Sequence, residues 1–284
     1  QAEQLESEGK YAQAAEIQRR RLVLSPGDVW ITYRLSRDLY SAGQRSQADN
    51  LMRQLASQKP GDPDQVYASG LYLSGNDQDR AALAHLNTLP RDKWNGNIQA
   101  LADRLQSNQV LETANRLRDS GKEQEAETLL RQQPPSTRID LTLADWAEQR
   151  GDHEAAKTAY NTVLQREPQN EDAILGLTEV SLAQGNKDAA RAALAKLPAA
   201  QNGEPLSINM QRRLAMAQAG LGDHAAAEKT FNAILPQAKS QPPSMESALV
   251  MRDAARFQAQ NGQPKQALDT WKDAMVSSGI TTTR

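Results

Sequence analysis

The chain has 284 residues, of which 38% are apolar and only 4% aromatic, while alanine (43 residues) and glutamine (29 residues) are abundant. This composition is lean for a globular core of that size and suits small helices that pack closely. A net charge of −2 gives no general attraction to nucleic acid or anionic membranes, and there is no cysteine for disulfides or thiolate chemistry. No apolar run approaches the 18 residues of a membrane-spanning helix, and no direct membrane insertion is expected. Because the sequence starts without methionine or a signal peptide, we expect it to be part of a longer protein.

A short phrase recurs along the chain: a glycine followed five residues later by an alanine. Several of these glycines are 34 residues apart, as are Pro26 and Pro60. A fixed period of this length is typical of repeat proteins. In chain order the pairs are Gly9/Ala14, Gly43/Ala48, Gly121/Ala126, Gly151/Ala156, Gly185/Ala190, Gly222/Ala227 and Gly262/Ala267.

The residues on both sides of each glycine predict two helices. Leu143 and Ala147 precede Gly151 at helical spacing, Tyr160 continues an apolar stripe after it, and Pro168 ends the second stretch. The glycine can take the left-handed conformation that ends a helix, and the alanine lets the two helices approach closely. A hairpin of about 34 residues cannot cover its own apolar face, so neighbouring hairpins must stack.

These phrases resemble the tetratricopeptide repeat (TPR), and the best copy covers residues 136–170. The resemblance implies an all-α, right-handed superhelical solenoid of about eight TPR hairpins. We expect residues 1–284 to form a single TPR array whose first unit is truncated and whose last four residues, 281–284, start a linker. The expected units are 1–27, 28–60, 61–90, 108–135, 136–170, 171–203, 204–243 and 244–280, with an irregular extra helix over 91–107.

Several longer stretches resemble one family in particular. VWITYRLSRDLYSAGQRSQAD (29–49), RQQPPSTRIDLTLADWA (131–147) and SQPPSMESALVMRDAA (240–255) resemble the TPR region of bacterial cellulose synthase operon protein C. This resemblance implies a periplasmic repeat array that precedes an outer-membrane β-barrel through which cellulose leaves the cell. The implied role is a non-catalytic scaffold between the inner-membrane synthase and that barrel, which also guides the glucan. Its implied partners are the cellulose synthase complex and the C-terminal barrel of the same chain, with cellulose or peptidoglycan as further candidate ligands. The alternative is a generic TPR adaptor that binds a peptide segment of a protein partner and makes no contact with sugar.

One helix face of the expected repeat 28–60 is unusually aromatic. Trp30, Tyr33, Arg37 and Tyr40 are spaced three, four and three residues apart, and Tyr72 is at the last of these repeat positions in the third unit. Flat rings can stack on glucose units, and arginine can bind hydroxyl groups or stack in turn. A ligand-binding role competes with the simpler interpretation that these rings pack against a neighbouring hairpin.

Charged residues occupy the corresponding positions elsewhere, which predicts a groove that changes sign along its length. The alternative is a solvated face without a ligand. The Lys/Asn clamp with which some relatives of this fold hold peptide C-termini is not evident. The acidic positions are Asp145, Glu148, Asp172 and Glu179, and the basic ones, of which Arg118 joins the candidate ligand-binding set, are Arg118, Arg212, Arg252 and Arg256.

The residues that could belong to enzyme or metal-binding motifs are not in the structural context that these motifs require. Gly220, Gly222 and Ala225 form a G-x-G-x-x-A, but they follow a helix and not a strand. His153 and His224 recur because the turn recurs, so they do not predict a metal site. We therefore predict no catalytic residue, no metal and no cofactor, which disfavours a glycan-processing enzyme. Trp146 and Trp271 are predicted to be core residues.

Overall fold

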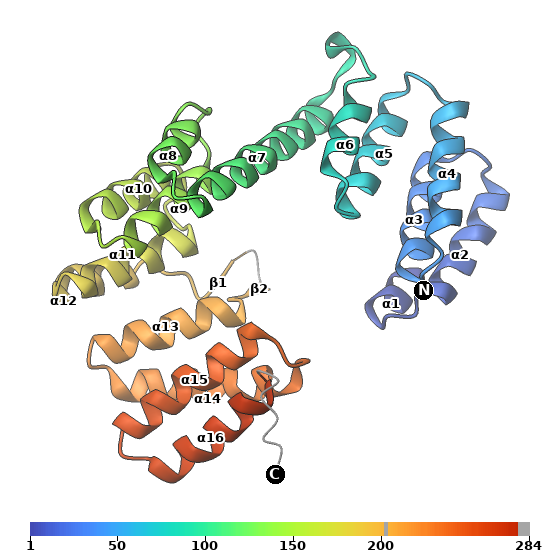
Figure 1. Cartoon of the computed structure of the whole chain (residues 1–284). Helices are drawn as coiled ribbons and strands as arrows, with labels where there is room; N and C mark the ends of the chain where they lie inside the picture. The colour runs from blue at the N-terminus through green and yellow to red at the C-terminus, as the bar shows by residue number, and fades with distance from the viewer. Residues whose placement is uncertain (202–203, 278–284) are drawn as a thin grey trace. The chain divides into compact units, whose positions relative to one another are not determined.

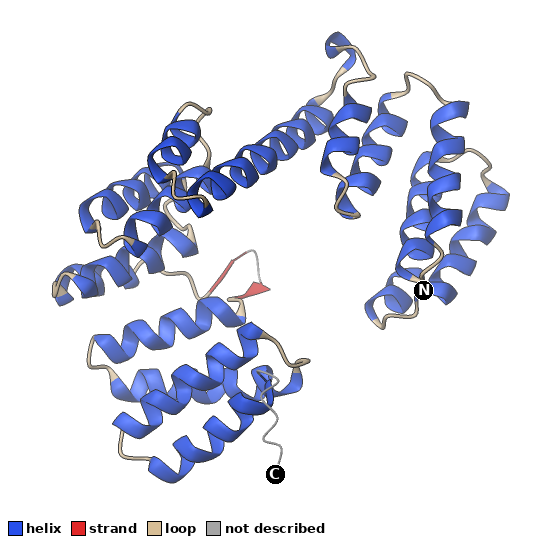
Figure 2. Cartoon of the chain, viewed as in Figure 1, coloured by secondary structure: helices blue, strands red, loops and turns tan. Residues whose placement is uncertain are grey.

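The computed structural model describes residues 1–201 and 204–277, and these residues form sixteen α-helices with one 3-10 helix between them (Figures 1 and 2). The predicted all-α fold of TPR hairpins is confirmed. The chain divides into two compact parts, Gln1–Gln132 and Gln133–Arg284, called the first and the second unit from here on. The single array over 1–284 and its unit boundaries stay predictions.

The helices of the first unit are α1 (Ala2–Ser7), α2 (Tyr11–Leu24), α3 (Val29–Ser41), α4 (Arg45–Gln58), α5 (Pro63–Gly75), α6 (Asp79–Leu86), the 3-10 helix η1 (Arg91–Lys93), α7 (Gly96–Asp119) and α8 (Glu123–Arg131). Those of the second unit are α9 (Thr137–Gln149), α10 (His153–Arg166), α11 (Glu171–Ala183), α12 (Lys187–Leu194), α13 (Ile208–Gly220), α14 (His224–Ser240), α15 (Met245–Gln260) and α16 (Pro264–Ser277).

The recurring phrase marks the hairpin turns. All seven repeat glycines have φ between 75° and 87°, the left-handed region that glycine adopts without steric cost. The alanine five residues later is buried in every case, at 0–4% exposure, where its small side chain allows close helix packing. The hairpin formed by α5 and α6 makes its turn differently. Gly75 ends α5, and Asp77, with φ of 60°, is the left-handed residue.

The first unit departs from the prediction between residues 91 and 135. A separate helix over 91–107 followed by a new unit is expected there, but α7 runs without a break through 24 residues. The Asn95 side chain starts this helix by accepting a hydrogen bond from the Ile98 amide at 2.9 Å. No glycine or proline interrupts residues 97–120, so the helix continues from the core around Leu101 to the part that packs against α8.

The second unit has four hairpins, α9/α10, α11/α12, α13/α14 and α15/α16, with an insertion between the second and third (Figure 1). In that insertion β1 (Ala200–Gln201) and β2 (Glu204–Pro205) form a two-residue antiparallel pairing, a small strand element that the sequence does not predict. Trp146 is 3% exposed, which confirms its predicted core position, whereas Trp271 is partly buried and packs against the cluster around Phe231.

Candidate functional site

The first helices of the hairpins carry two chemically different sets of side chains. In the first unit they form an aromatic face, defined here as Trp30, Tyr33, Arg37 and Tyr40 on α3 with Tyr67 and Tyr72 on α5. In the second unit they form a charged ladder, defined as Glu148, Asp172, Glu179, Arg212, Arg213 and Asp253 on α9, α11, α13 and α15.

Three rings of the aromatic face meet edge to face. The Trp30 ring lies 5.9 Å from that of Tyr33 at 84°, and also 5.9 Å from that of Tyr67 at 69°. The Arg37 guanidinium lies 5.6 Å from the Tyr33 ring centre and pairs with Glu6 at 3.2 Å. The three rings are half-buried and Arg37 is exposed, so the cluster combines packing with an open surface.

A second aromatic pair lies at the other end of α3. Tyr40 and Tyr72 are T-shaped, with ring centres 6.1 Å apart, and Arg45 lies over the Tyr40 ring at 5.0 Å. Tyr72 is only 4% exposed, and its hydroxyl donates to Asp49 at 2.6 Å. Burial and the hydrogen bond to Asp49 raise the pKa of Tyr72. Tyr72 therefore supports Tyr40 from within the packed layer, as the packing interpretation expects.

The sequence pattern does not group Tyr67 with this face. Its ring meets Trp30 because α5 packs beside α3, a relation between hairpins that spacing within one helix does not reveal. Arg118, by contrast, lies in the last turn of α7, away from α3 in Figure 1, and pairs with Glu123 at 3.4 Å. The structure does not bring Arg118 to the aromatic face.

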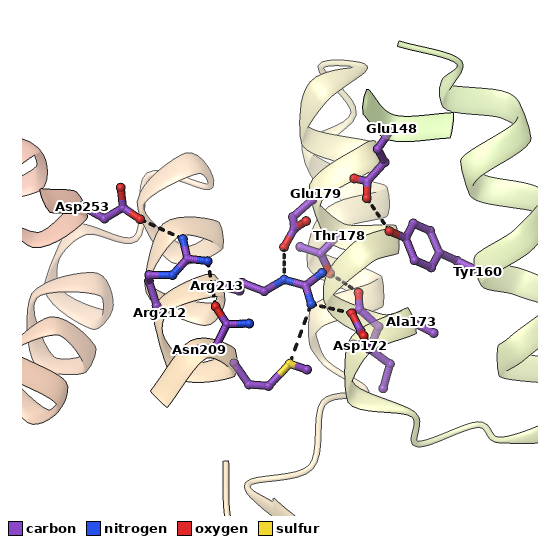
Figure 3. Close-up of polar contacts among 12 residues, drawn as sticks. Glu148, Tyr160, Asp172, Ala173, Thr178, Glu179, Asn209, Arg212, Arg213 and Asp253 are labelled. Carbon is purple, nitrogen blue, oxygen red and sulfur yellow. Dashed lines mark hydrogen bonds and ion pairs between the residues drawn. The ribbon is translucent and has the colours of Figure 1, made fainter. Parts of the chain in front are cut away.

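The charged ladder holds neighbouring hairpins together (Figure 3). Arg213 on α13 donates from Nε to Glu179 and from Nη1 to Asp172, both on α11 and both at 2.6 Å. The Arg213 side chain is 15% exposed, so these bonds lie in a largely dehydrated contact. Within the α9/α10 hairpin, the Tyr160 hydroxyl donates to Glu148, whose pKa is raised by burial.

The next step of the ladder joins α13 to α15. Arg212 donates to Asp253 at 2.8 Å and to Asn209 at 2.8 Å, and Arg252 donates to the other oxygen of Asp253 at 3.2 Å. Asp253 is 2% exposed, so two arginines compensate one buried carboxylate.

These contacts change the expected pattern of acidic and basic stretches along the groove. Asp172 and Glu179 do not form an open acidic stretch, because Arg213 pairs with both. Asp145 and Arg256 are exposed, with Asp145 accepting from Gln149 at 2.8 Å. Sequence reasoning named Arg212 and missed Arg213, which lies about 100° further around the helix and faces the preceding hairpin.

Within the part of the chain that the structure describes, no three His, Asp or Glu side chains converge on a point that could hold a metal ion. The histidines have other surroundings: His85 lies 2.8 Å from the Gln65 amide, and the His224 ring lies 6.4 Å from that of Phe257. Among the described helices, none is both long enough and apolar enough to cross a membrane.

Stacked helical hairpins with left-handed glycines at the turns define the class of TPR proteins. The tetratricopeptide repeat family model matches residues 147–213. A solved structure titled as the Cut9–Hcn1 hetero-tetramer of APC/C aligns with a TM-score of 0.51 at 12% identity, over 96% of this chain and 51% of that one. At this identity the likeness concerns the fold alone. The fold of the described residues is that of a tetratricopeptide-repeat array.

The sequence similarity to curated proteins is more specific than the fold. The whole chain is 72% identical to a segment of cellulose synthase operon protein C from Escherichia coli K12, and 71% identical to one of the same protein from Salmonella typhimurium LT2. The chain spans about a quarter (24%) of the length of these curated relatives. The resemblance expected from the sequence is therefore confirmed along all 284 residues.

Proposed function

We propose that this chain is a non-catalytic periplasmic TPR scaffold for the export of bacterial cellulose. It connects the inner-membrane synthase with an outer-membrane β-barrel that belongs to the same protein. The observation that carries the proposal is the 72% identity to cellulose synthase operon protein C over the complete sequence, loops between hairpins included.

The structure supports a spacer role in a physical sense. Within each compact unit, hairpins pack against their sequence neighbours, so the length of such an array can be extended without rebuilding a common core. In the second unit the ion pairs of Arg213 and Arg212 add polar contacts between consecutive hairpins. The partners in this proposal are components of the cellulose synthase complex.

The aromatic face supports a second part of the proposal, guidance of the glucan. Sugar rings present apolar C–H faces that stack on flat aromatic rings, and Trp30 and Tyr33 supply such rings on a half-open surface. Arg37 lies beside them and is exposed, where it can donate to hydroxyl groups. Peptidoglycan presents similar sugar faces and is the competing ligand.

Two measurements test the proposal. In a cellulose-producing strain, removal of this segment from the export protein is expected to abolish secretion, while the synthase in isolated membranes still makes glucan. Capture of synthase components by the tagged chain is expected from the same strain. Secretion that is unchanged without the segment would overturn the scaffold role.

Glucan guidance is tested separately, by titration of the chain with cellohexaose. The Trp30→Ala/Tyr33→Ala double variant is expected to lose binding by about tenfold or more, since it removes both stacking rings and the stacking of a flat nucleic-acid base on one aromatic ring already contributes on the order of 1–3 kcal/mol. Trp94→Ala is the matched control, because Trp94 is also half-buried and has Arg91 over its ring at 4.2 Å, but lies outside the aromatic face. Equal binding by the parent and the double variant would leave the adaptor function as the better account.

A further inference from the structure

A groove of about 830 Å³ lies between α2 and α4, with α3 as its floor. Leu22 and Val23 line it from α2, Leu51 from α4, and Thr32 and Leu35 from below. Val23 is 77% exposed, and the neighbouring Leu24 is 85% exposed, although apolar side chains of this size are usually covered. Thr32 and Leu35 project from a different side of α3 than Trp30 and Tyr33, so the groove is distinct from the aromatic face.

Two contacts fix the ends of the groove and show that α2 and α4 run in the same direction. Arg19 of α2 donates to Gln47 of α4 at 3.0 Å at one end. Lys59, directly after α4, lies beside Gly27 at the other end, where a Cβ on Gly27 would come within 3.9 Å of the Lys59 side chain. From residue 47 to residue 58 the α4 wall is about 16 Å long. An extended peptide of about five residues has that length.

The α4 wall carries side-chain amides at a helical repeat. Asn50, Gln54 and Gln58 all line the groove and follow one another at intervals of four residues, or about 6 Å. The groups on one edge of an extended peptide recur every two residues, or about 6.6 Å. A carboxamide both donates and accepts, so it can pair with peptide N–H and C=O groups in either direction. The apolar side chains of Leu51 and Leu55 lie between these amides on the same wall.

The charges around the groove favour a partner with carboxylates. The lining contains one charged residue, Arg19, which pairs with Glu16 at 3.4 Å, and it contains no Asp or Glu. Lys59 at the other end is half-buried and is not among the described residues that have an ion pair. A carboxylate at that end of the groove would gain a favourable interaction in a partly dehydrated place.

We propose that this groove binds an extended segment of a partner protein, about five residues long, with apolar side chains at alternate positions and an acidic residue next to Lys59. The apolar side chains cover Leu22, Val23 and Leu51, while the backbone pairs with the amides of α4. This interaction is independent of glucan contact, because it uses the opposite side of α3 from Trp30.

Fluorescence anisotropy with two labelled peptides tests the proposal on the full chain. Both peptides alternate three valines with two serines, and one carries two aspartates at each end where the other carries two lysines. The acidic peptide is expected to bind with a Kd below about 1 mM, and the basic peptide about tenfold more weakly. Lys59→Glu is expected to reverse this preference.

A second variant and a control separate the groove from general surface effects. Val23→Glu is expected to weaken the acidic peptide by about tenfold, because it places a carboxylate on the groove wall. Met245→Glu changes a residue of similar exposure (74%) in the second unit and is expected to leave binding unchanged. No binding of the acidic peptide at about 1 mM, an unchanged preference in Lys59→Glu, or displacement of the peptide by cellohexaose would each overturn the proposal.

Discussion

The two units use the same repeat positions for different chemistry. The residue three before the turn glycine is Tyr40 in the second hairpin and Glu148 in the hairpin of Gly151, and the residue six before it is Arg37 in one and Asp145 in the other. Tyr40 packs against a neighbouring ring, whereas Glu148 accepts a hydrogen bond from Tyr160. The repeat therefore fixes where a side chain is placed, and not whether that place binds a ligand or holds hairpins together.

A buried position shows the same contrast more sharply. Five residues before the turn glycine, the second unit has Trp146 at 3% exposure, and the first unit has Asp38 at 1% exposure. The tryptophan fills a core position with apolar surface. The Asp38 carboxyl faces Glu6 of α1, and its Oδ2 has no hydrogen-bond partner within the described structure. At this repeat position, helix packing should therefore depend on pH in the first unit, whereas Trp146 does not titrate.

The largest effect is expected from the charged ladder. Arg213→Ala leaves Glu179 and Asp172 without their cation in a partly dehydrated contact, so the free energy of unfolding should fall by about 3 kcal/mol. Chemical denaturation of the whole chain measures this loss. Lys239→Ala is the control, because its pair with Asp273 is about half exposed and should contribute no more than about 1 kcal/mol. Equal losses in the two variants would contradict the structural role given to Arg213.

A smaller effect is expected from glycines that make room for neighbouring side chains. A Cβ on Gly176 would lie 2.2–2.6 Å from the buried Tyr160 ring, whereas one on Gly70 would meet the flexible ends of Leu86 and Leu101 at 2.9–3.0 Å. Gly176→Ala should therefore destabilise by about 2 kcal/mol net of the helix preference of alanine, and Gly70→Ala by less than about 1 kcal/mol.

A second substitution that removes the Tyr160 ring distinguishes a steric collision at Gly176 from a change in helix preference. Adding Tyr160→Leu to Gly176→Ala should give a double variant that is more stable than additivity predicts, since the ring that collides is gone. Thermal or urea unfolding of the four proteins supplies the comparison. Strict additivity would show that the collision is relieved elsewhere in the second unit.

The smallest effect is local and depends on pH. Burial and the neighbouring Glu6 carboxyl raise the pKa of Asp38 to about 7, while Arg37 opposes this increase. Because the folded-state pKa is above the unfolded one, the contribution of Asp38 to stability is largest near pH 4 and is lost as the pH rises to about 7. The stability lost in this way cannot exceed the free energy with which α1 docks on α3. Once α1 separates from α3, the Asp38 carboxyl is hydrated and its pKa is no longer raised.

Hydrogen exchange of the α1 amides, corrected for intrinsic rates, tests this at pH 5 and pH 8. Protection in Ala2–Ser7 should fall with rising pH in the parent, and Asp38→Asn should remove most of that fall. Glu3→Gln changes an exposed acid on the same helix and should leave the fall intact. Protection that is independent of pH would contradict the raised pKa of Asp38.

The sequence alone determined the hairpins and their turns. A left-handed glycine, a small alanine five residues later and apolar residues at helical spacing all act within about 30 residues, so the local pattern reports them directly. The candidate residues Trp30, Tyr33 and Tyr40 could be placed on one helix face for the same reason. The continuous α7 was missed because its two parts were assigned to different units, although no residue between 97 and 120 breaks a helix.

Only the tertiary structure decided which residues meet across hairpins. Tyr67 meets Trp30, Arg213 pairs with Glu179, and Glu6 raises the pKa of Asp38, and each of these interactions depends on how one helix pair packs on the next. The packing angle and the axial offset between hairpins set such contacts, and neither follows from spacing within a helix. The same stacking decides which charged or polar side chains are buried. The sequence therefore predicts the repeat position of a residue but not its burial or its partners.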